Sequence, residues 1–373
     1  MKTVLLISNT AWSFYKFRKG LITALVNQGL KVILVAPSDE FQQLLEALGT
    51  KFIPLKTLEG KSKNAFKDIA FVRELFEIYR SVTPHLIIQY TIKPNIYSSY
   101  VANRLKIPTI GVVTGLGYTF INKNIVSAIS RRLYRMAFRL VGEVWFLNEE
   151  DREVFYRYRL VNPAKTHVIN GEGVNCAEFD PGLFLSSIPA GQPLRFVLPA
   201  RLLYDKGVLE YVEAAREIKM RYPDVEFNLL GFLNVNNPSA VSAATMQEWV
   251  DEGVVNYLGS KDDVRTTLIS HHCVVLPSYR EGMSMVLMES AALERPIIAS
   301  NIPGCKQIVE DGKTGFLCRP KDKADLARQM EKFILLDQET RINMGRQARK
   351  KMMNEFSEQI IISGYMERIF ELL

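Results

Sequence analysis

The sequence predicts an α/β protein made of two doubly wound parallel sheets in tandem. Short β-rich runs alternate with helix-like stretches, and one segment without periodicity interrupts this alternation near the middle of the chain. The 373 residues suffice for two domains of ordinary size, and a hydrophobic share of 47% is that of a soluble globular protein. Ligands of such sheets bind beyond the carboxyl ends of the strands, so we expect the site in a cleft between the two halves.

In the first half, runs of β-branched and aliphatic residues are expected to form buried strands at Val4–Ile7, Val32–Val35, Phe52–Leu55, Leu86–Gln89, Thr109–Val113, Val144–Leu147 and Val168–Ile169. The stretch FRKGLITALVNQG between the first two runs has an apolar helical face that includes Leu21 and Leu25. Gly29 is expected to end this helix. Strand, helix and strand together form a βαβ unit, and its repetition predicts the parallel sheet.

The segment DPGLFLSSIPAGQP (180–193) is rich in Pro, Gly and Ser, and we expect a linker at 184–193. The alternation then restarts, with strands expected at Phe196–Leu198, Glu226–Leu230, Val254–Leu258, Val274–Leu276, Ile297–Ala299 and Gly315–Leu317. The closing stretch FSEQIIISGYMERIFELL is amphipathic and is expected to cross back to the first half. These features predict a first domain at 1–183 with 357–373, and a second domain at 194–356.

Two cations follow the first strand of the second half. Arg201 and Lys206 lie just before Gly207, which opens the next helix. A guanidinium and an ammonium at the end of a strand, beside the start of a helix, suit a diphosphate. Surface cations without a ligand would have the same pattern.

Two glutamates follow the fourth strand of the second half, in YREGMSMVLMES (279–290). Glu281 lies in the predicted loop, Ser284 is the expected N-cap of a helix, and Glu289 lies inside that helix. The backbone N–H groups at this helix start, those of Ser284, Met285 and Val286, are expected to be free for a phosphate. By themselves the glutamates also fit solvated surface charges or the paired carboxylates of a glycosidase.

The pattern R-x4-K-G followed by E-x7-E, formed by Arg201, Lys206, Gly207, Glu281 and Glu289, resembles the retaining GT-B glycosyltransferases of family 4. Residues 280–317 resemble the donor region of that family, and the resemblance extends in order over the whole chain. It implies a GT-B fold, in which two Rossmann-like domains face a cleft and a C-terminal helix returns to the first domain.

The resemblance also implies roles for these side chains. Arg201 and Lys206 would hold the diphosphate of a nucleotide sugar, expected to be UDP-linked, and offset the charge that develops on the leaving group. Glu281 would contact the donor sugar and Glu289 the ribose, which makes the glutamates ligand-holding groups. Further donor contacts are implied for Gly207, Leu258, Met283, Ser284, Met285 and Val286.

No metal or other cofactor is expected. The chain has no D-x-D, so the usual carboxylate ligands of a Mg²⁺-bridged diphosphate are missing. Its cysteines form no CxxC pair, and the run His271–His272–Cys273 is too compact for a zinc site. Family members often carry a donor-contacting histidine where this chain has a glycine-rich loop, so no histidine is given a catalytic role.

The loops of the first half are expected to contact the acceptor. SNTAWSFYKFRKG after the first strand lacks GxGxxG, which argues against a dinucleotide oxidoreductase. Its mixture of aromatic and cationic residues suits sugars and phosphates. QYTIKPNIYSS and VTGLGYTF, after the fourth and fifth strands, resemble the branch that acts on polyprenyl-diphosphate-linked sugars in bacterial glycan assembly, and NGEGVN (170–175) resembles a loop that lines the cleft. The implied acceptor or cleft residues are Trp12, Ser13, Phe14, Tyr15, Lys16, Lys93, Asn95, Gly115, Gly117 and Gly173.

The charge is divided unevenly. Residues 1–180 carry 24 Lys and Arg against 15 Asp and Glu, whereas the remainder carries 23 against 25. The stretch IVSAISRRLYRMAFRL (125–140) has an apolar helical face with arginines beside it, a pattern that can bind an anionic leaflet. A core-facing helix with a solvated basic side fits equally well. The apolar face is Ile125, Ile129, Leu133, Met136 and Leu140, and the expected membrane contacts are Arg131, Arg132, Arg135 and Arg139.

The expected function is therefore the retaining transfer of a hexosamine, with N-acetylgalactosamine from UDP as the first choice, to a saccharide linked to undecaprenyl diphosphate. The expected location is the inner face of the cytoplasmic membrane, where the protein is peripheral. A different nucleotide sugar, or a nucleotide-sugar 2-epimerase, is the alternative. The pI of 9.1 alone suggests nucleic-acid binding, but the basic residues are dispersed and no known module is found, so no nucleic-acid partner is expected.

Overall fold

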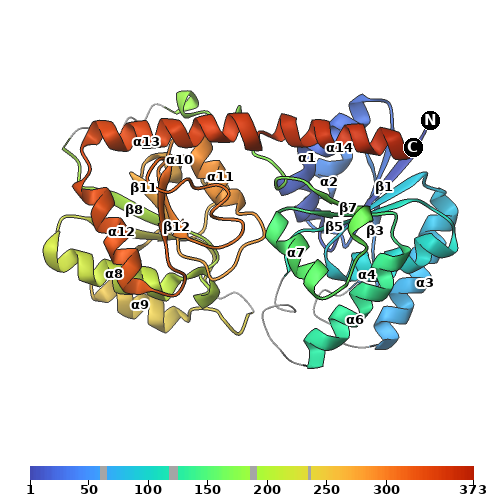
Figure 1. Cartoon of the computed structure of the whole chain (residues 1–373), viewed down its shortest axis with the longest axis horizontal. Helices are drawn as coiled ribbons and strands as arrows, with labels where there is room; N and C mark the ends of the chain where they lie inside the picture. The colour runs from blue at the N-terminus through green and yellow to red at the C-terminus, as the bar shows by residue number, and fades with distance from the viewer. Residues whose placement is uncertain (59–64, 117–124, 185–190, 234–236) are drawn as a thin grey trace. The chain divides into compact units, whose positions relative to one another are not determined.

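The structure is a computed structural model that describes residues 1–58, 65–116, 125–184, 191–233 and 237–373 (Figure 1). The chain forms two compact units, Met1–Glu172 with Glu358–Leu373, and Gly173–Ser357. Each unit contains one parallel sheet with helices packed against it, which confirms the predicted fold class.

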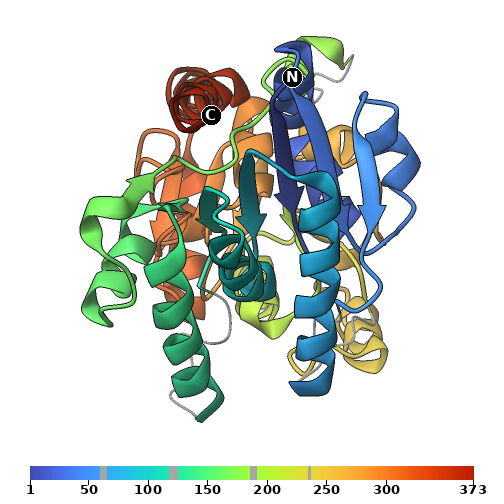
Figure 2. The same ribbon diagram turned by 90° about the vertical axis from the view of Figure 1, so that its right-hand side faces the viewer.

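The first unit has a seven-stranded sheet in the order β3-β2-β1-β4-β5-β6-β7. The strands are β1 (Thr3–Ile7), β2 (Lys31–Ala36), β3 (Lys51–Pro54), β4 (Leu86–Tyr90), β5 (Thr109–Val113), β6 (Glu143–Phe146) and β7 (Thr166–Val168). The helices are α1 (Ala11–Asn27), α2 (Gln42–Glu46), α3 (Ala65–Val82), α4 (Ile92–Arg104), α6 (Ile125–Leu140), α7 (Glu149–Arg157) and α14 (Glu358–Leu372). Figure 2 shows α3 and α6 in front of this sheet.

Helix α14 ends the chain and belongs to the first unit, as predicted. It lies beside α1 in Figure 1. Its Tyr365 is buried against Trp145 of β6, with ring centroids 4.8 Å apart. Arg368 donates from Nε to Oε1 of Glu143 at 2.7 Å. Apolar packing and an ion pair thus attach the returning helix to the sheet of the first unit.

A buried ion pair lies at the end of the first unit's main segment. Arg18 of α1 pairs with Glu172, and their side chains are only 4% and 7% exposed. The Arg18 guanidinium also lies 3.8 Å from the ring centroid of Tyr90, the last residue of β4, and donates to the carbonyl oxygen of Ser13 at 3.0 Å. This pair connects α1, β4 and the end of the first unit's main segment, and no local sequence pattern indicates it.

The second unit has a six-stranded sheet in the order β10-β9-β8-β11-β12-β13. The strands are β8 (Arg195–Pro199), β9 (Glu226–Leu230), β10 (Asn256–Tyr257), β11 (Cys273–Leu276), β12 (Ile297–Ser300) and β13 (Gly315–Cys318). The helices are α8 (Val208–Arg221), α9 (Ala243–Asp251), α10 (Arg265–Ile269), α11 (Met285–Ala292), α12 (Lys323–Leu335) and α13 (Gln338–Lys351). One apolar cluster includes residues of α8, α9 and α12, the other includes residues of α10 and α11, and α13 contributes to both.

The boundary between the units differs from the predicted one. Residues 173–183 belong to the second unit, whereas the sequence predicts them in the first domain. Val174 is buried in an apolar cluster of the second unit and donates its N–H to the carbonyl of Phe356 at 2.9 Å. Arg349 of α13 donates to the carbonyl of Phe179 at 2.9 Å. The expected strand Val254–Leu258 is also wrong in length, because only Asn256 and Tyr257 pair with β9.

Candidate active site

The ends of β8 and β11 form the topological switch point of the second unit. These strands are neighbours, and the chain continues from β8 to one side of the sheet and from β11 to the other. Ligands of doubly wound sheets bind at such a point, outside the carboxyl ends of the strands. Arg201 and Lys206 follow β8, and Glu281 follows β11, so the fold places the predicted cations and the first glutamate at this point.

Lys206 and Glu281 are in direct contact there. The Lys206 ammonium lies 2.5 Å from Oε1 of Glu281, and the two side chains are 21% and 12% exposed. The Ser278 hydroxyl donates to the same carboxylate oxygen at 2.7 Å. The carboxylate is thus held by two donors, and the ammonium remains partly open to solvent. A ligand phosphate would approach an ammonium whose position Glu281 already holds.

Glycine backbones bring three loops together around this pair. Gly207 has a φ of +76°, and a Cβ there would lie 2.2 Å from the carbonyl oxygen of Pro277. Tyr279 donates its N–H to the carbonyl of Asp205 at 2.9 Å. Gly304, which follows β12, has a φ of +75°, and a Cβ there would lie 2.4 Å from the carbonyl oxygen of the residue after Glu281. Only residues without a side chain permit these approaches.

Helix α11 begins at the same place. Ser284 is its N-cap, as predicted, but the Ser284 side chain makes no capping hydrogen bond. The expectation that the Ser284 N–H is free for phosphate is wrong, because this group donates to the carbonyl of Gly304 at 3.3 Å. Met285 and Val286 occupy the first turn, where N–H groups have no acceptor inside the helix. Two backbone donors are therefore available for an anion.

The remaining predicted donor residues lie in the second unit. The Arg201 side chain is exposed, and its guanidinium has no ion pair among the residues that the structure describes. Glu289 is partly exposed on α11. Leu258 donates its N–H to the carbonyl of Leu229 at 2.9 Å, which places it beside the end of β9. Met283 is partly buried and packs on the apolar cluster beneath α11.

Three of the predicted acceptor residues at the start of α1 are accessible. The Trp12 side chain is 44% exposed, Lys16 is exposed, and Tyr15 is partly exposed. The Tyr15 and Phe41 rings are 5.3 Å apart, and the Lys16 ammonium lies 5.8 Å from the Phe41 ring centroid. These side chains follow β1, one of the two strands at the switch point of the first sheet.

The assignments of Ser13 and Phe14 to ligand contacts are wrong. Phe14 is completely buried and packs edge-on against Tyr90, with ring centroids 6.3 Å apart. Ser13 is 7% exposed, and its hydroxyl lies 2.8 Å from that of Ser8. Its N–H donates to Oγ1 of Thr10, which caps α1. Both residues build the helix start and are closed to a ligand.

Asn95 is also wrongly assigned to the acceptor. It is fully buried in α4, and its Nδ2 donates to the carbonyl of Val112 on β5 at 2.9 Å. Lys93 is 20% exposed, and its ammonium lies 2.9 Å from the carboxylate of Asp68. An acceptor that used Lys93 would therefore meet an ammonium that is already paired with a carboxylate.

Backbone geometry distinguishes the turns after β4 and β5. Thr91, directly after β4, has a φ of +70°, which is a strained conformation for a β-branched residue. No sequence pattern indicates this positive φ at Thr91.

Of the glycines predicted to line the cleft, Gly115 has a φ of +139° and is partly exposed, whereas Gly117 lies outside the described residues. Gly173 has a φ of +79° and is buried as the first residue of the second unit.

Helix α6 has two different apolar faces. Tyr134 and Phe138 are 2% and 1% exposed and pack in the core of the first unit. The other face carries Ile129, Met136 and Leu140, which are 53%, 55% and 37% exposed. We call these three, with the partly buried Leu133, the apolar stripe of α6. Of the predicted membrane contacts, Arg132, Arg135 and Arg139 are exposed, and Arg131 lies 4.9 Å from the ring centroid of Tyr158.

Two of the four histidines, His271 and His272, lie directly before β11. Burial lowers the pKa of His271 and of His272 to about 4, so both are neutral at pH 7. His271 contacts the carbonyl of Thr267 through Nδ1 at 2.6 Å.

Among the described residues, no group of three His, Cys, Asp or Glu side chains is arranged to hold a metal ion. In the same part of the chain, no helix is long and apolar enough to cross a membrane.

Two families match this chain, one in each half. The family described as Glycosyl transferase 4-like matches residues 3–148, and the family described as Glycosyl transferases group 1 matches residues 186–351. The N,N'-diacetylbacillosaminyl-diphospho-undecaprenol alpha-1,3-N-acetylgalactosaminyltransferase of Campylobacter jejuni is 28% identical, over 97% of this chain and 96% of its own length. The capsular polysaccharide glycosyltransferase CapM of Staphylococcus aureus is 30% identical over 43% of this chain and 42% of its own length.

Solved structures share the fold over the whole chain. A glycosyltransferase from Rickettsia africae has a TM-score of 0.82 at 20% identity, and the match covers 100% of this chain and 98% of that one. HepE from Anabaena, crystallised in complex with UDP, has a TM-score of 0.80 at 16% identity, with full coverage of both chains. At these identities the likeness shows the GT-B fold.

Replacing Gly207 by Ala should destabilise the protein much more than replacing Gly253 by Ala. Both glycines have a left-handed backbone, with φ of +76° and +69°, which costs an alanine about 1–2 kcal/mol. A Cβ at Gly253 would have no neighbour within 4 Å, whereas one at Gly207 would collide with the Pro277 carbonyl. Urea unfolding of the full-length variants measures the difference. Equal losses would show that the loops after β8 and β11 separate easily.

Proposed function

This chain is a glycosyltransferase of the GT-B fold in family 4, and on this premise we propose that it transfers a hexosamine to a saccharide carried by undecaprenyl diphosphate. N-acetylgalactosamine from a UDP donor is the first choice, and the anomeric configuration is retained. The main observation in support of nucleotide-sugar binding is the Lys206–Glu281 pair at the switch point, beside the start of α11. The similarity of almost the whole chain to the Campylobacter jejuni N-acetylgalactosaminyltransferase supports the sugar and the acceptor.

The donor diphosphate would bind among the cations and backbone donors of the second unit. Lys206 and Arg201 bring two positive charges to the end of β8, and the N–H groups of Met285 and Val286 add the positive end of a helix. When the diphosphate binds, the Lys206 ammonium would share its charge between Glu281 and a phosphate oxygen. Oε2 of Glu281, which takes no part in the contacts of Oε1 with Lys206 and Ser278, would accept a hydrogen bond from a sugar hydroxyl. Glu289 is proposed to hold the ribose.

The proposed reaction follows a front-face path. The bond between the anomeric carbon and the phosphate oxygen breaks, and the acceptor hydroxyl oxygen forms its bond to that carbon on the same face. The proton of the acceptor hydroxyl moves to the departing phosphate oxygen. Negative charge that builds up on the diphosphate is stabilised by the cations of Arg201 and Lys206, which leaves no step for a histidine or a metal ion.

Contact with a membrane is proposed for α6 of the first unit. Its apolar stripe is exposed although the helix has a separate buried face, and three exposed arginines lie on the same helix. An anionic leaflet would take up the stripe among its acyl chains and attract the arginines. A lipid-linked acceptor resides in such a membrane, so this contact would bring the enzyme to its substrate. We place the protein at the inner face of the cytoplasmic membrane.

The donor can be identified by saturation-transfer NMR with UDP-, GDP- and ADP-sugars, without metal and then with Mg²⁺. We expect UDP-N-acetylgalactosamine to bind without metal, and binding to be lost in Arg201→Ala and in Glu289→Ala. Binding by none of these sugars would remove the basis for the donor assignment. Appearance of an epimerised donor in the absence of acceptor would instead favour the 2-epimerase.

Replacing Lys206 by Ala should reduce kcat by on the order of 10²-fold, the scale of losing one preorganised charge contact to the transition state. The matched control is Lys313→Ala, because Lys313 is 56% exposed and pairs with Glu310 on the surface. Steady-state assays of sugar transfer with both variants measure the effect. Turnover of Lys206→Ala at the rate of the control would contradict the site.

Replacing Ile129 and Met136 by Ser should weaken binding to anionic vesicles by about tenfold or more for each side chain. Complete burial of such a side chain contributes roughly 1.5–3 kcal/mol. Met220→Ser is the matched control, because Met220 is 80% exposed on α8 of the second unit. Cosedimentation with vesicles measures the affinity. Undiminished binding of the α6 variants would mean that the stripe does not enter the bilayer.

A further inference from the structure

A basic pocket lies between the C-terminal part of α6 and the segment that follows α7. Its volume is about 290 Å³, far more than the roughly 30 Å³ that one water occupies in the liquid. The lining residues are Arg135, Phe138, Arg139, Arg159, Leu160, Val161, Asn162 and Lys165. Four of these residues are cations and none is an acid. The pocket therefore has the lining of an anion site.

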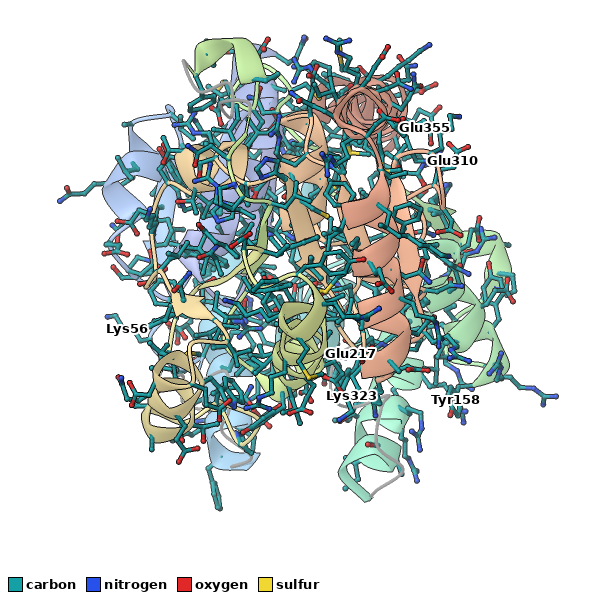
Figure 3. All side chains as sticks on the ribbon, turned by 90° about the vertical axis from the view of Figure 1, so that its left-hand side faces the viewer. Lys56, Tyr158, Glu217, Glu310, Lys323 and Glu355 are labelled. Atoms are coloured by element: carbon teal, nitrogen blue, oxygen red, sulfur yellow. The ribbon has the colours of Figure 1, made fainter. Side chains whose placement is uncertain are left out.

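Two of the four cations are held by backbone carbonyls. Arg135 donates from Nε to the carbonyl of Arg159 at 3.1 Å and from Nη2 to that of Tyr158 at 2.8 Å. Lys165 donates from Nζ to the carbonyl of Val141 at 2.9 Å. Tyr158 is labelled in Figure 3. In these contacts Arg135 and Lys165 bind the last carbonyl groups near the C-terminal ends of α7 and α6, where cations are favourable, and the same contacts place both side chains at the pocket wall.

The other two cations have no such explanation. Arg139 and Arg159 are exposed, and neither side chain has a hydrogen bond or an ion pair among the residues that the structure describes. Arg159 also has a φ of +52°, an uncommon backbone conformation for an arginine. Two unpaired guanidiniums beside two fixed cations leave a positive potential that backbone carbonyls offset only in part. A bound phosphate group would accept hydrogen bonds from both guanidiniums.

We propose that this pocket binds the phosphate of an anionic glycerophospholipid headgroup. Free phosphate shares this chemistry, but the surroundings favour the lipid. Arg139 follows Met136, an exposed member of the apolar stripe, by three residues, and this spacing puts both side chains on one face of α6. A lipid whose headgroup phosphate occupies the pocket would thus find apolar surface for its acyl chains on the same helix. The proposal rests on the membrane contact proposed for α6 and adds a defined headgroup site to it.

The test compares two double variants that remove the same charge. Arg139→Gln with Arg159→Gln removes the unpaired cations of the pocket, whereas Arg104→Gln with Arg157→Gln removes two exposed arginines of the first unit that do not line it. Cosedimentation is measured with vesicles of phosphatidylcholine containing increasing phosphatidylglycerol. We expect the pocket variant to bind at least tenfold more weakly than the control variant. Thermal unfolding checks that both variants are folded.

Equal weakening of the two variants would overturn the proposal, because a diffuse positive field would then explain the attraction. A second arm adds soluble glycerophosphoglycerol or inorganic phosphate at constant ionic strength. Displacement of the wild-type chain from vesicles, with no effect on the residual binding of the pocket variant, supports a headgroup site. Binding of inorganic phosphate without any effect on vesicle binding would assign the pocket to free phosphate. The assay contains neither nucleotide sugar nor acceptor, so its outcome is independent of the donor assignment.

Discussion

The close approach of the backbone at Gly207 to the carbonyl of Pro277 is the constraint on which the candidate donor site depends. The loop after β8 and the loop after β11 are separated by some seventy residues of chain, yet a Cβ at Gly207 would lie 2.2 Å from the Pro277 carbonyl oxygen. A second glycine, Gly304, lets the loop after β12 reach the same place. The loops that follow β8 and β11 are therefore packed together, and Lys206 can reach Glu281.

The electrostatic state of the site follows from this packing. The Lys206–Glu281 pair is nearly neutral as a unit, so the half-buried ammonium is stable before any anion arrives. Arg201 remains exposed, and the first-turn N–H groups of α11 have no partner inside the helix. The site thus combines one paired charge, one exposed charge and backbone dipoles. This combination suits a diphosphate whose negative charge increases during the reaction.

In two helices of the first unit, residues close together in the sequence alternate between buried and exposed positions. In α1, Phe14 and Arg18 are buried, whereas Trp12 and Lys16 are exposed. In α6, Tyr134 and Phe138 fill the core, whereas Met136 and Arg139 face outward. The helical period makes this separation possible, because residues three and four apart share a face and their neighbours do not. One helix can therefore support the sheet with one face and expose apolar and basic side chains on the other.

The sequence by itself determined the α/β class, the alternation of strands and helices, the returning last helix and the cations at the end of β8. Periodicity and turn residues encode these features locally. Only the tertiary structure decided which polar residues are accessible. Ser and Asn are common in ligand-binding loops, but Ser13 and Asn95 are buried. Their side chains form hydrogen bonds with Ser8 and with the carbonyl of Val112 inside the fold. Arg18 and Glu172 lie far apart in the chain, so no local pattern predicts their buried pair. The boundary at Gly173 likewise depends on contacts with α13 and on Phe356, because packing between distant segments is a property of the folded chain.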